Sequence, residues 1–169
     1  MKRSIIAACL LTFFFVAILS ACSSPSALLQ KRMQCYSSAV DGELPDDLRL
    51  TIYYLSPSIL TRVPLSSDHL ISYSLTEKII VESSELVKYQ ELLQKMNVSA
   101  LQTDSEETYM NARLYYVFST EDNEKLLEVV LSDRARDPFV NGIQVKDSNI
   151  VFELITPFLP EDVRNMFGF

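Results

Sequence analysis

Hydrophobic and polar residues alternate over residues 112–133 in a way that predicts a β-hairpin. A loop at residues 121–124 would pair apolar residues on one side: Phe118 with Leu127, Tyr116 with Val129, and Leu114 with Leu131. The other side would pair Arg113 with Ser132, Tyr115 with Val130, Val117 with Glu128, and Ser119 with Leu126. A slip of one residue would mix the two sides, so the pattern specifies the register.

Two further stretches predict strands. Asn141-Gly142 lies between short apolar runs, and this pair tolerates the positive φ angles of a type I′ hairpin turn. Residues 49–55 are rich in β-branched and aromatic residues before Pro57, and residues 77–81 form a shorter run. On the first of these strands Tyr53 faces away from the side that carries Leu50 and Ile52.

Other stretches have helical spacing. Residues 83–97 predict a helix that begins at Ser83 and Ser84 and buries a stripe of Leu86, Tyr89, Leu93 and Met96. Residues 28–36 have some helical character. Ser148 is the expected cap of a helix that Pro157 ends, and a last short helix starts near Pro160. Residues 56–75 contain two prolines and predict a long ordered loop with one helical turn.

These elements together predict an α+β domain. The sheet is mainly antiparallel and has about five or six strands, with helices packed on one face.

The amino terminus predicts export. Lys2 and Arg3 precede an apolar run from Ile5 to Leu19, whose 15 residues are fewer than the roughly 20 that a membrane-spanning helix needs. Leu19-Ser20-Ala21-Cys22 follows, and it resembles the lipobox of bacterial lipoproteins. An uncleaved N-terminal anchor is the alternative reading of the same run.

The resemblance implies that the chain is cut before Cys22 and that the thiol of Cys22 carries a diacylglyceryl lipid. We therefore expect a signal peptide at 1–21, a lipidated tether and short helix at 22–47, in which Ser23 to Ser26 form a short polar tether, and a single α+β domain at 48–169. The lipid would hold the protein on the outer side of the cell membrane. The whole pattern is similar to that of many small bacterial lipoproteins, most of all the Gram-positive type.

The charge of the chain excludes some partners. The full sequence has 15 basic and 22 acidic residues, a formal charge of −7, and the expected signal removes two of the basic ones. An acidic domain is repelled by phosphate backbones and by anionic headgroups. We therefore expect no nucleic-acid partner, and we expect membrane attachment through the lipid alone.

The residue types needed for most catalysis are scarce. The chain has one histidine, His69, and three glycines, so no phosphate-binding glycine loop or nucleophile elbow is present. Cys35 is predicted to be a small buried residue without a disulfide partner, although a Cys35–His69 nucleophile is the enzymatic alternative. Acidic clusters at 46–47, 106–107 and 121–124 lack the EF-hand pattern and are predicted to be solvated. We expect no catalytic residues, no metal site and no cofactor.

Tyrosine is the residue class that suggests an interaction surface. Tyr53 and Tyr115 are predicted on the sheet face opposite the core, and tyrosine is enriched at protein interfaces. The alternative is that helices or residues 56–75 cover this face. The sequence favours a non-catalytic binding module for an exported protein, a peptide or an envelope component. The alternative function is an envelope accessory or inhibitor that acts on another exported protein, and an enzyme is less favoured.

Overall fold

A computed structural model describes residues 24–104, 109–132, 138–146 and 148–168. The predicted signal, Cys22 and the acidic pair at 106–107 lie outside the described residues. The elements follow one another along the chain as α2 (Pro25–Val40), β1 (Arg49–Tyr54), α3 (Ser67–Ser72), β2 (Glu77–Glu82), α4 (Ser83–Leu86), η1 (Val87–Tyr89), α5 (Gln90–Lys95), η2 (Val98–Ala100), β3 (Leu114–Ser119), β4 (Lys125–Leu131), β5 (Phe139–Val140), β6 (Ile143–Gln144), α6 (Asn149–Glu153), η3 (Thr156–Phe158) and α7 (Glu161–Phe167).

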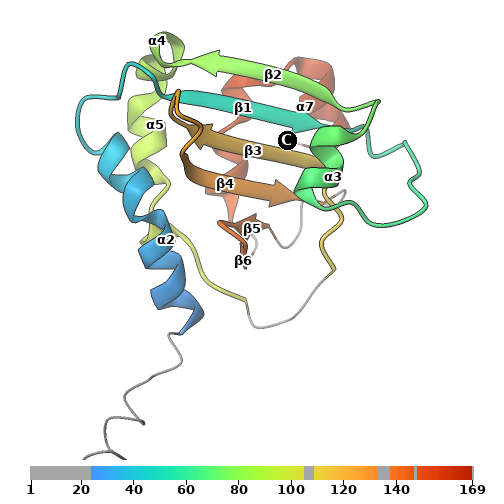
Figure 1. Cartoon of the computed structure of the whole chain (residues 1–169), viewed down its shortest axis with the longest axis horizontal. Helices are drawn as coiled ribbons and strands as arrows, with labels where there is room; N and C mark the ends of the chain where they lie inside the picture. Colours follow the sequence, from blue (N-terminus) through green and yellow to red (C-terminus); the bar gives the residue numbers. More distant parts are fainter. Residues whose placement is uncertain (1–23, 105–108, 133–137, 147, 169) are drawn as a thin grey trace, which may run out of the picture.

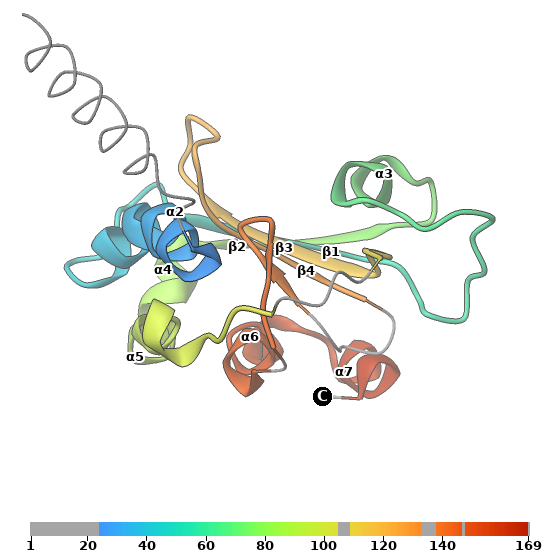
Figure 2. The ribbon, with the colours of Figure 1, turned by 90° about the horizontal axis from the view of Figure 1, so that it is seen from below.

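The strands form one antiparallel sheet of six strands in the order β2-β1-β3-β4-β5-β6 (Figure 1). The predicted α+β class is confirmed. Helices α5, α6 and α7 lie on one side of the sheet, whereas α3 lies on the other side (Figure 2). The expectation that helices pack on one face therefore has one exception, α3.

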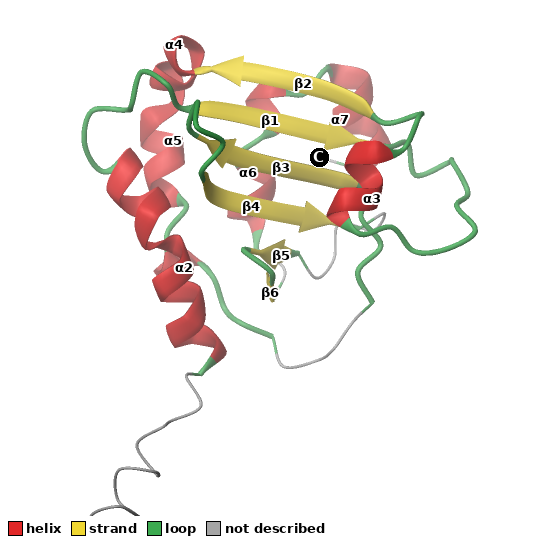
Figure 3. Cartoon of the chain, in the orientation of Figure 1, coloured by secondary structure: helices red, strands yellow, loops and turns green. Residues whose placement is uncertain are grey.

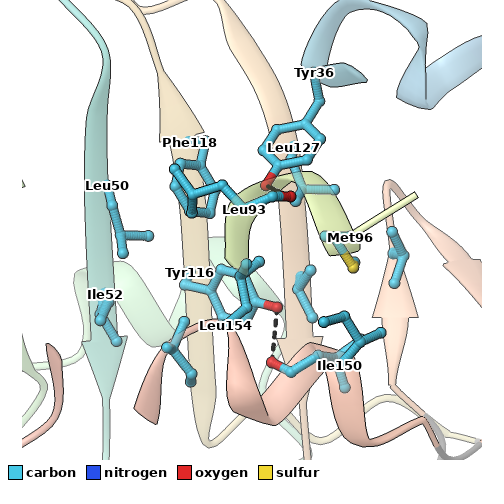
Figure 4. Packing of buried hydrophobic residues seen from close by; sticks show 14 of the residues in the cluster. Tyr36, Leu50, Ile52, Leu93, Met96, Tyr116, Phe118, Leu127, Ile150 and Leu154 are labelled. Atoms are coloured by element: carbon cyan, nitrogen blue, oxygen red, sulfur yellow. Dashed lines mark hydrogen bonds between the residues drawn. The ribbon is translucent and has the colours of Figure 1, made fainter. Parts of the chain in front are cut away.

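The main core lies between the sheet and the helices α2, α4, α5, α6 and α7. Two buried tyrosines join the layers: the hydroxyl of Tyr36 donates to the carbonyl oxygen of Leu93 at 3.0 Å, and that of Tyr116 donates to the carbonyl oxygen of Val151 at 2.8 Å. Figure 4 shows these side chains among their apolar neighbours. Because both hydroxyls have partners, the two rings are buried without leaving a polar group unsatisfied.

The long hairpin has the predicted register along most of its length. Tyr116 pairs with Val129, Phe118 with Leu127, and Tyr115 with Val130. The predicted pairing of Ser119 with Leu126 is wrong, because the register shifts after Phe118 and Ser119 pairs with Lys125. The irregularity turns Leu126 into the main core, which it would not reach in a regular ladder.

The predicted helix at 83–97 is interrupted. Residues 83–95 form α4, η1 and α5, and the backbone of Tyr89 leaves the helical region with φ −117° and ψ 17°. The ring of Tyr89 packs edge-on against Phe158 at 4.9 Å between ring centres. The predicted stripe is still the inward side, since Leu86, Leu93 and Met96 are buried and Tyr89 is half-buried.

Ser148 is the N-cap residue of α6, as predicted, whereas the N-cap of α4 is Glu82, and neither predicted serine makes a capping hydrogen bond with its side chain. The hydroxyl of Ser83 donates to the carbonyl oxygen of Pro45 at 2.7 Å instead of capping α4. The hydroxyl of Ser148 likewise donates to the carbonyl oxygen of Ala100 at 3.2 Å. Both side chains connect distant segments of the chain, a use that local sequence does not reveal.

Helix α2 starts earlier and runs further than predicted. The side chain of Ser24 accepts a hydrogen bond from the backbone N–H of Ala27 at 3.3 Å, and Pro25 occupies the first helical turn. Residues 25 and 26 are therefore helical, and the prediction that they belong to the tether is wrong. Leu29, Met33 and Tyr36 are buried in the main core, so α2 packs with the sheet.

Candidate ligand groove on the open face of the sheet

The second face of the sheet is covered at one end. There a smaller apolar cluster joins α3 and the segment before it to the sheet, with Leu55, Leu65 and Leu70 buried against Tyr115. Figure 3 shows α3 over the ends of β1 and β3, with the rest of this face in view. The predicted helical turn within residues 56–75 is α3, and it covers only part of the face.

A groove of about 210 Å³ lies on the uncovered part. Its walls come from β1, β2, β3, the start of β4, α3 and the β3–β4 turn. The lining residues are Arg49, Thr51, Tyr53, Ile71, Lys78, Ile80, Tyr115, Val117, Ser119, Asn123 and Lys125. Three of them are basic and none is acidic, although the chain as a whole carries a formal charge of −7.

Tyr53 and Tyr115 form the aromatic centre of the groove. They pair across β1 and β3 and stack with ring centres 5.9 Å apart and ring planes at 25°. The ammonium of Lys78 lies 5.4 Å from the centre of the Tyr53 ring, and that of Lys125 lies 5.8 Å from the centre of the Tyr115 ring. These are cation–π distances, so each ring holds a cation over the groove.

The two tyrosines differ in exposure. Tyr53 is half-buried, whereas Tyr115 is 1% exposed. The ring of Tyr53 lies between Lys78 on β2 and Tyr115 on β3, so its edge is the part that faces the groove. Both predicted residues therefore line the groove.

Tyr115, Lys125 and Glu128 form a small polar network at the edge of the groove. The hydroxyl of Tyr115 donates to a carboxylate oxygen of Glu128 at 3.0 Å, and the ammonium of Lys125 lies 3.1 Å from the same oxygen. Burial, followed by the charge of Glu128, raises the pKa of Tyr115 to about 12. Burial alone would lower the pKa of Lys125, but the contacts with Glu128 and Tyr115 outweigh it and raise that pKa.

The third basic residue of the groove, Arg49, forms an ion pair with Glu82, with 3.2 Å between Nε and the carboxylate oxygen. Both side chains are largely solvated, so this pair contributes little to stability.

Sequence reasoning missed Arg49, Lys78 and Lys125 as groove residues. Alternation on β1 placed Arg49 with Tyr53, but the strand neighbours that bring in Lys78 depend on long-range pairing.

The other candidate residues do not come together. Cys35 is exposed on α2, so the prediction that it is buried is wrong. His69 is exposed on α3 at the opposite face of the sheet, and the Cys35–His69 nucleophile is not formed. Among the described residues, no group of three or more His, Cys, Asp or Glu side chains is placed to hold a metal ion.

A second and more open hollow lies between α2 and η2. Its volume is about 760 Å³, and Gln30, Lys31, Gln34, Asn97 and Ser99 are among its lining residues. It contains no aromatic side chain and no acid–base pair. We therefore take the sheet groove as the candidate site.

Comparison with known proteins gives no relative: no family model, no curated protein and no solved structure matches this chain. Over the residues that the structure describes, none of the helices has both the length and the apolar character of a membrane span.

Proposed function

We propose that this chain is a membrane-anchored, extracytoplasmic lipoprotein that binds an anionic ligand on the open face of its sheet and has no catalytic activity. The observation that carries the proposal is the charge of the groove. Three basic side chains line it, in a chain whose acidic residues outnumber its basic ones by seven. Arg49 and Lys125 each contact a carboxylate beside the groove, Glu82 and Glu128, whereas Lys78 lies over the ring of Tyr53. Such local segregation of charge attracts a ligand of the opposite sign.

The shape of the groove narrows the ligand class. The lining runs across four neighbouring strands and combines the edge of the Tyr53 ring with the apolar side chains of Ile71 and Ile80. A ligand that fits would be extended, would carry carboxylate or phosphate groups near Lys78 and Lys125, and would place an apolar part against Ile80 and the edge of Tyr53. An acidic peptide segment and an anionic envelope polymer share this chemistry.

A site-specific crosslinking experiment tests the groove. A photoreactive amino acid at Ser119, inside the groove, is compared with one at Lys88, which is exposed on η1 away from it. We expect a product of defined mass from position 119 alone. Lys125→Glu should reduce that product roughly tenfold, because it reverses a charge in the groove, and added salt should weaken it too. Equal products from both positions, or an unchanged yield in Lys125→Glu, would contradict the proposal.

Membrane attachment is tested at Cys22. We expect mass spectrometry to find a chain that begins at Cys22 with a diacylglyceryl group on its sulfur. Cys22→Ala should move the protein from the membrane fraction to the soluble or unprocessed fraction. Cys35→Ala is the matched control, because Cys35 is exposed on the folded domain and should leave attachment unchanged. An unmodified terminus with the protein in the cytosol would refute the anchor.

The alternative function, an accessory or inhibitor that acts on another exported protein, is favoured by a different observation. Leu60 is 92% exposed, Val63 62% and Leu75 57%, and all three lie on the chain around α3. Exposed apolar side chains mark a protein contact when they form one patch. The same crosslinking separates the two functions: a photoreactive residue at Leu60 should capture one exported protein in a fixed ratio if the alternative holds, and position 119 should not.

A further inference from the structure

Strand β2 is an edge of the sheet that no described element pairs on its outer side (Figure 1). Its residues Glu77–Glu82 pair in continuous register with β1 on the inner side. An edge strand presents a row of unpaired backbone N–H and C=O groups, which is a template for another strand. The outer edge of β2 therefore has the backbone groups needed for an interaction.

The side chains at the centre of β2 do not prevent another strand from pairing with this edge. The strand has no proline, its pairing with β1 has no register shift, and Ile80 at its centre is 47% exposed. Natural edges are commonly protected by proline, bulges or charged side chains, lysine above all, and β2 has only the last of these, towards its ends. Here the charged residues Glu77, Lys78 and Glu82 stand towards the ends, with Ile79, Ile80 and Val81 between them.

This arrangement is complementary to itself. Residues directly opposite in an antiparallel pair point to the same side of the sheet. When a two-fold axis perpendicular to the sheet relates the two strands, each residue therefore lies opposite one that points to the same side, that is, an even-numbered residue opposite an even-numbered one and an odd-numbered residue opposite an odd-numbered one. An axis beside Ile80 places Ile80 opposite Ile80 of the second copy. It also forms two opposite-charge pairs, each between Lys78 of one copy and Glu82 of the other. On the other side the same register opposes Ile79 and Val81.

The neighbouring symmetric registers are poorer. Shifting the axis to Ile79 opposes Lys78 with Ile80, and shifting it to Val81 opposes Ile80 with Glu82. Each of these shifts exchanges two opposite-charge pairs for a charge facing an apolar side chain. The sequence of β2 thus favours one register for pairing with its own copy.

We propose that two copies of this chain associate through β2, antiparallel, with the two-fold axis at Ile80. The two sheets then form one continuous sheet, and Glu82 lies between Arg49 of its own chain and Lys78 of the second copy. The axis keeps both open faces on the same side, so the two ligand grooves stand side by side. The dimer and the ligand groove share Lys78 and Ile80, but the backbone pairing of the dimer comes from β2 and needs no ligand.

Charge reversal in co-expressed full-length chains tests the dimer. One copy carries one affinity tag and the other a second tag, and the second is quantified after capture of the first. Wild-type copies should co-purify. Two Lys78→Glu copies oppose glutamates at both charged positions, and two Glu82→Lys copies oppose lysines, so each combination should lose roughly tenfold or more of the captured partner.

Co-expression of the two different variants tests whether charge pairing across β2 holds the dimer together. A Lys78→Glu copy and a Glu82→Lys copy restore both opposite-charge pairs, so they should co-purify at close to the wild-type level. This recovery also shows that both variants fold. Lys95→Glu and Glu91→Lys make the same charge changes at exposed positions of α5 and should leave capture unchanged.

Three results would overturn the dimer: wild-type copies that do not co-purify, variants that co-purify as well as the wild type, or a mixed pair that recovers nothing. The groove experiment uses Ser119 and Lys125, which lie outside β2. Failure of the dimer and failure of the ligand proposal are therefore distinguishable.

Discussion

The ionisation of Tyr115 links the groove to the stability of the sheet. Its hydroxyl donates to Glu128, and its ring is covered by Lys125 and stacked on Tyr53. A phenolate at this position would lose its hydrogen bond to Glu128 and would be repelled by that carboxylate. The fold therefore favours the neutral form of Tyr115.

This preference predicts a loss of stability at alkaline pH. The pKa of Tyr115 is raised from 10.0 to about 12 in the fold, so the unfolded chain releases this proton first as the pH rises. The contribution is fully present below pH 10 and is lost as the pH rises through about 12. Urea unfolding at a series of pH values should show the decline, and phenolate absorbance should show a late-titrating tyrosine.

Tyr115→Phe is the control for the alkaline series. It should flatten the decline without abolishing it, because burial and Glu77 raise the pKa of Tyr54 to about 12 as well. A slope between pH 10 and pH 12 that is identical in the wild type and in Tyr115→Phe would contradict the assignment.

Among the elements, the two-residue turn of the β5–β6 hairpin forms hydrogen bonds to two distant parts of the chain. Asn141 and Gly142 have φ angles of 48° and 74°, as the sequence predicted for a type I′ turn. The side chain of Asn141 accepts from the backbone N–H of Glu128 at 2.8 Å and donates to the carbonyl oxygen of Arg32 at 2.9 Å. The turn thereby connects β4 with α2.

Replacing the glycine of this turn should be costly. Gly142→Ala places a side chain at positive φ, and its Cβ would lie 3.2 Å from Nη1 of Arg32. We expect the free energy of unfolding to fall by roughly 1–2 kcal/mol. Gly42→Ala is the matched control, because no atom lies within 4 Å of the added Cβ, and it should change stability by less than about 0.5 kcal/mol. Equal effects in chemical denaturation would show that the turn is not strained.

The elements also show which parts of the fold could be predicted from the sequence. The β3–β4 register could be predicted because alternation and a short loop fix it locally, and the Asn-Gly turn for the same reason. The shift at Ser119 and the break at Tyr89 have no local signal, since packing against distant residues decides them. The groove was predicted in part: Tyr53 and Tyr115 follow from alternation, whereas Lys78 reaches them through β1–β2 pairing across a long connection.

For the whole molecule, the main consequence is that α2 is part of the fold. Its buried residues reach β4 and α5, and the side chain of Gln94 donates to the carbonyl oxygen of Val40 at 2.9 Å. The expected division of the chain at residue 48 therefore does not separate two independent cores.

Met33→Ala tests this integration. Met33 is fully buried, so its truncation should lower the free energy of unfolding of the entire domain by about 2–5 kcal/mol in a single transition. Gln34→Ala, at the exposed neighbouring position, should change it by less than about 0.5 kcal/mol. If α2 melted separately while the sheet stayed folded, two transitions would appear and the integration would be refuted.

The early start of α2 has a mechanical meaning for a lipidated protein. Ser23 alone separates Cys22 from the Ser24 cap, and 16 helical residues at 1.5 Å each extend about 24 Å from there along the domain. With a lipid on Cys22, the helix and the domain that it packs against would move as one body, attached two residues from the start of the fold. Reach towards a target would then be set by the domain's own dimensions, and inserting a glycine-serine spacer after Cys22 would lengthen it.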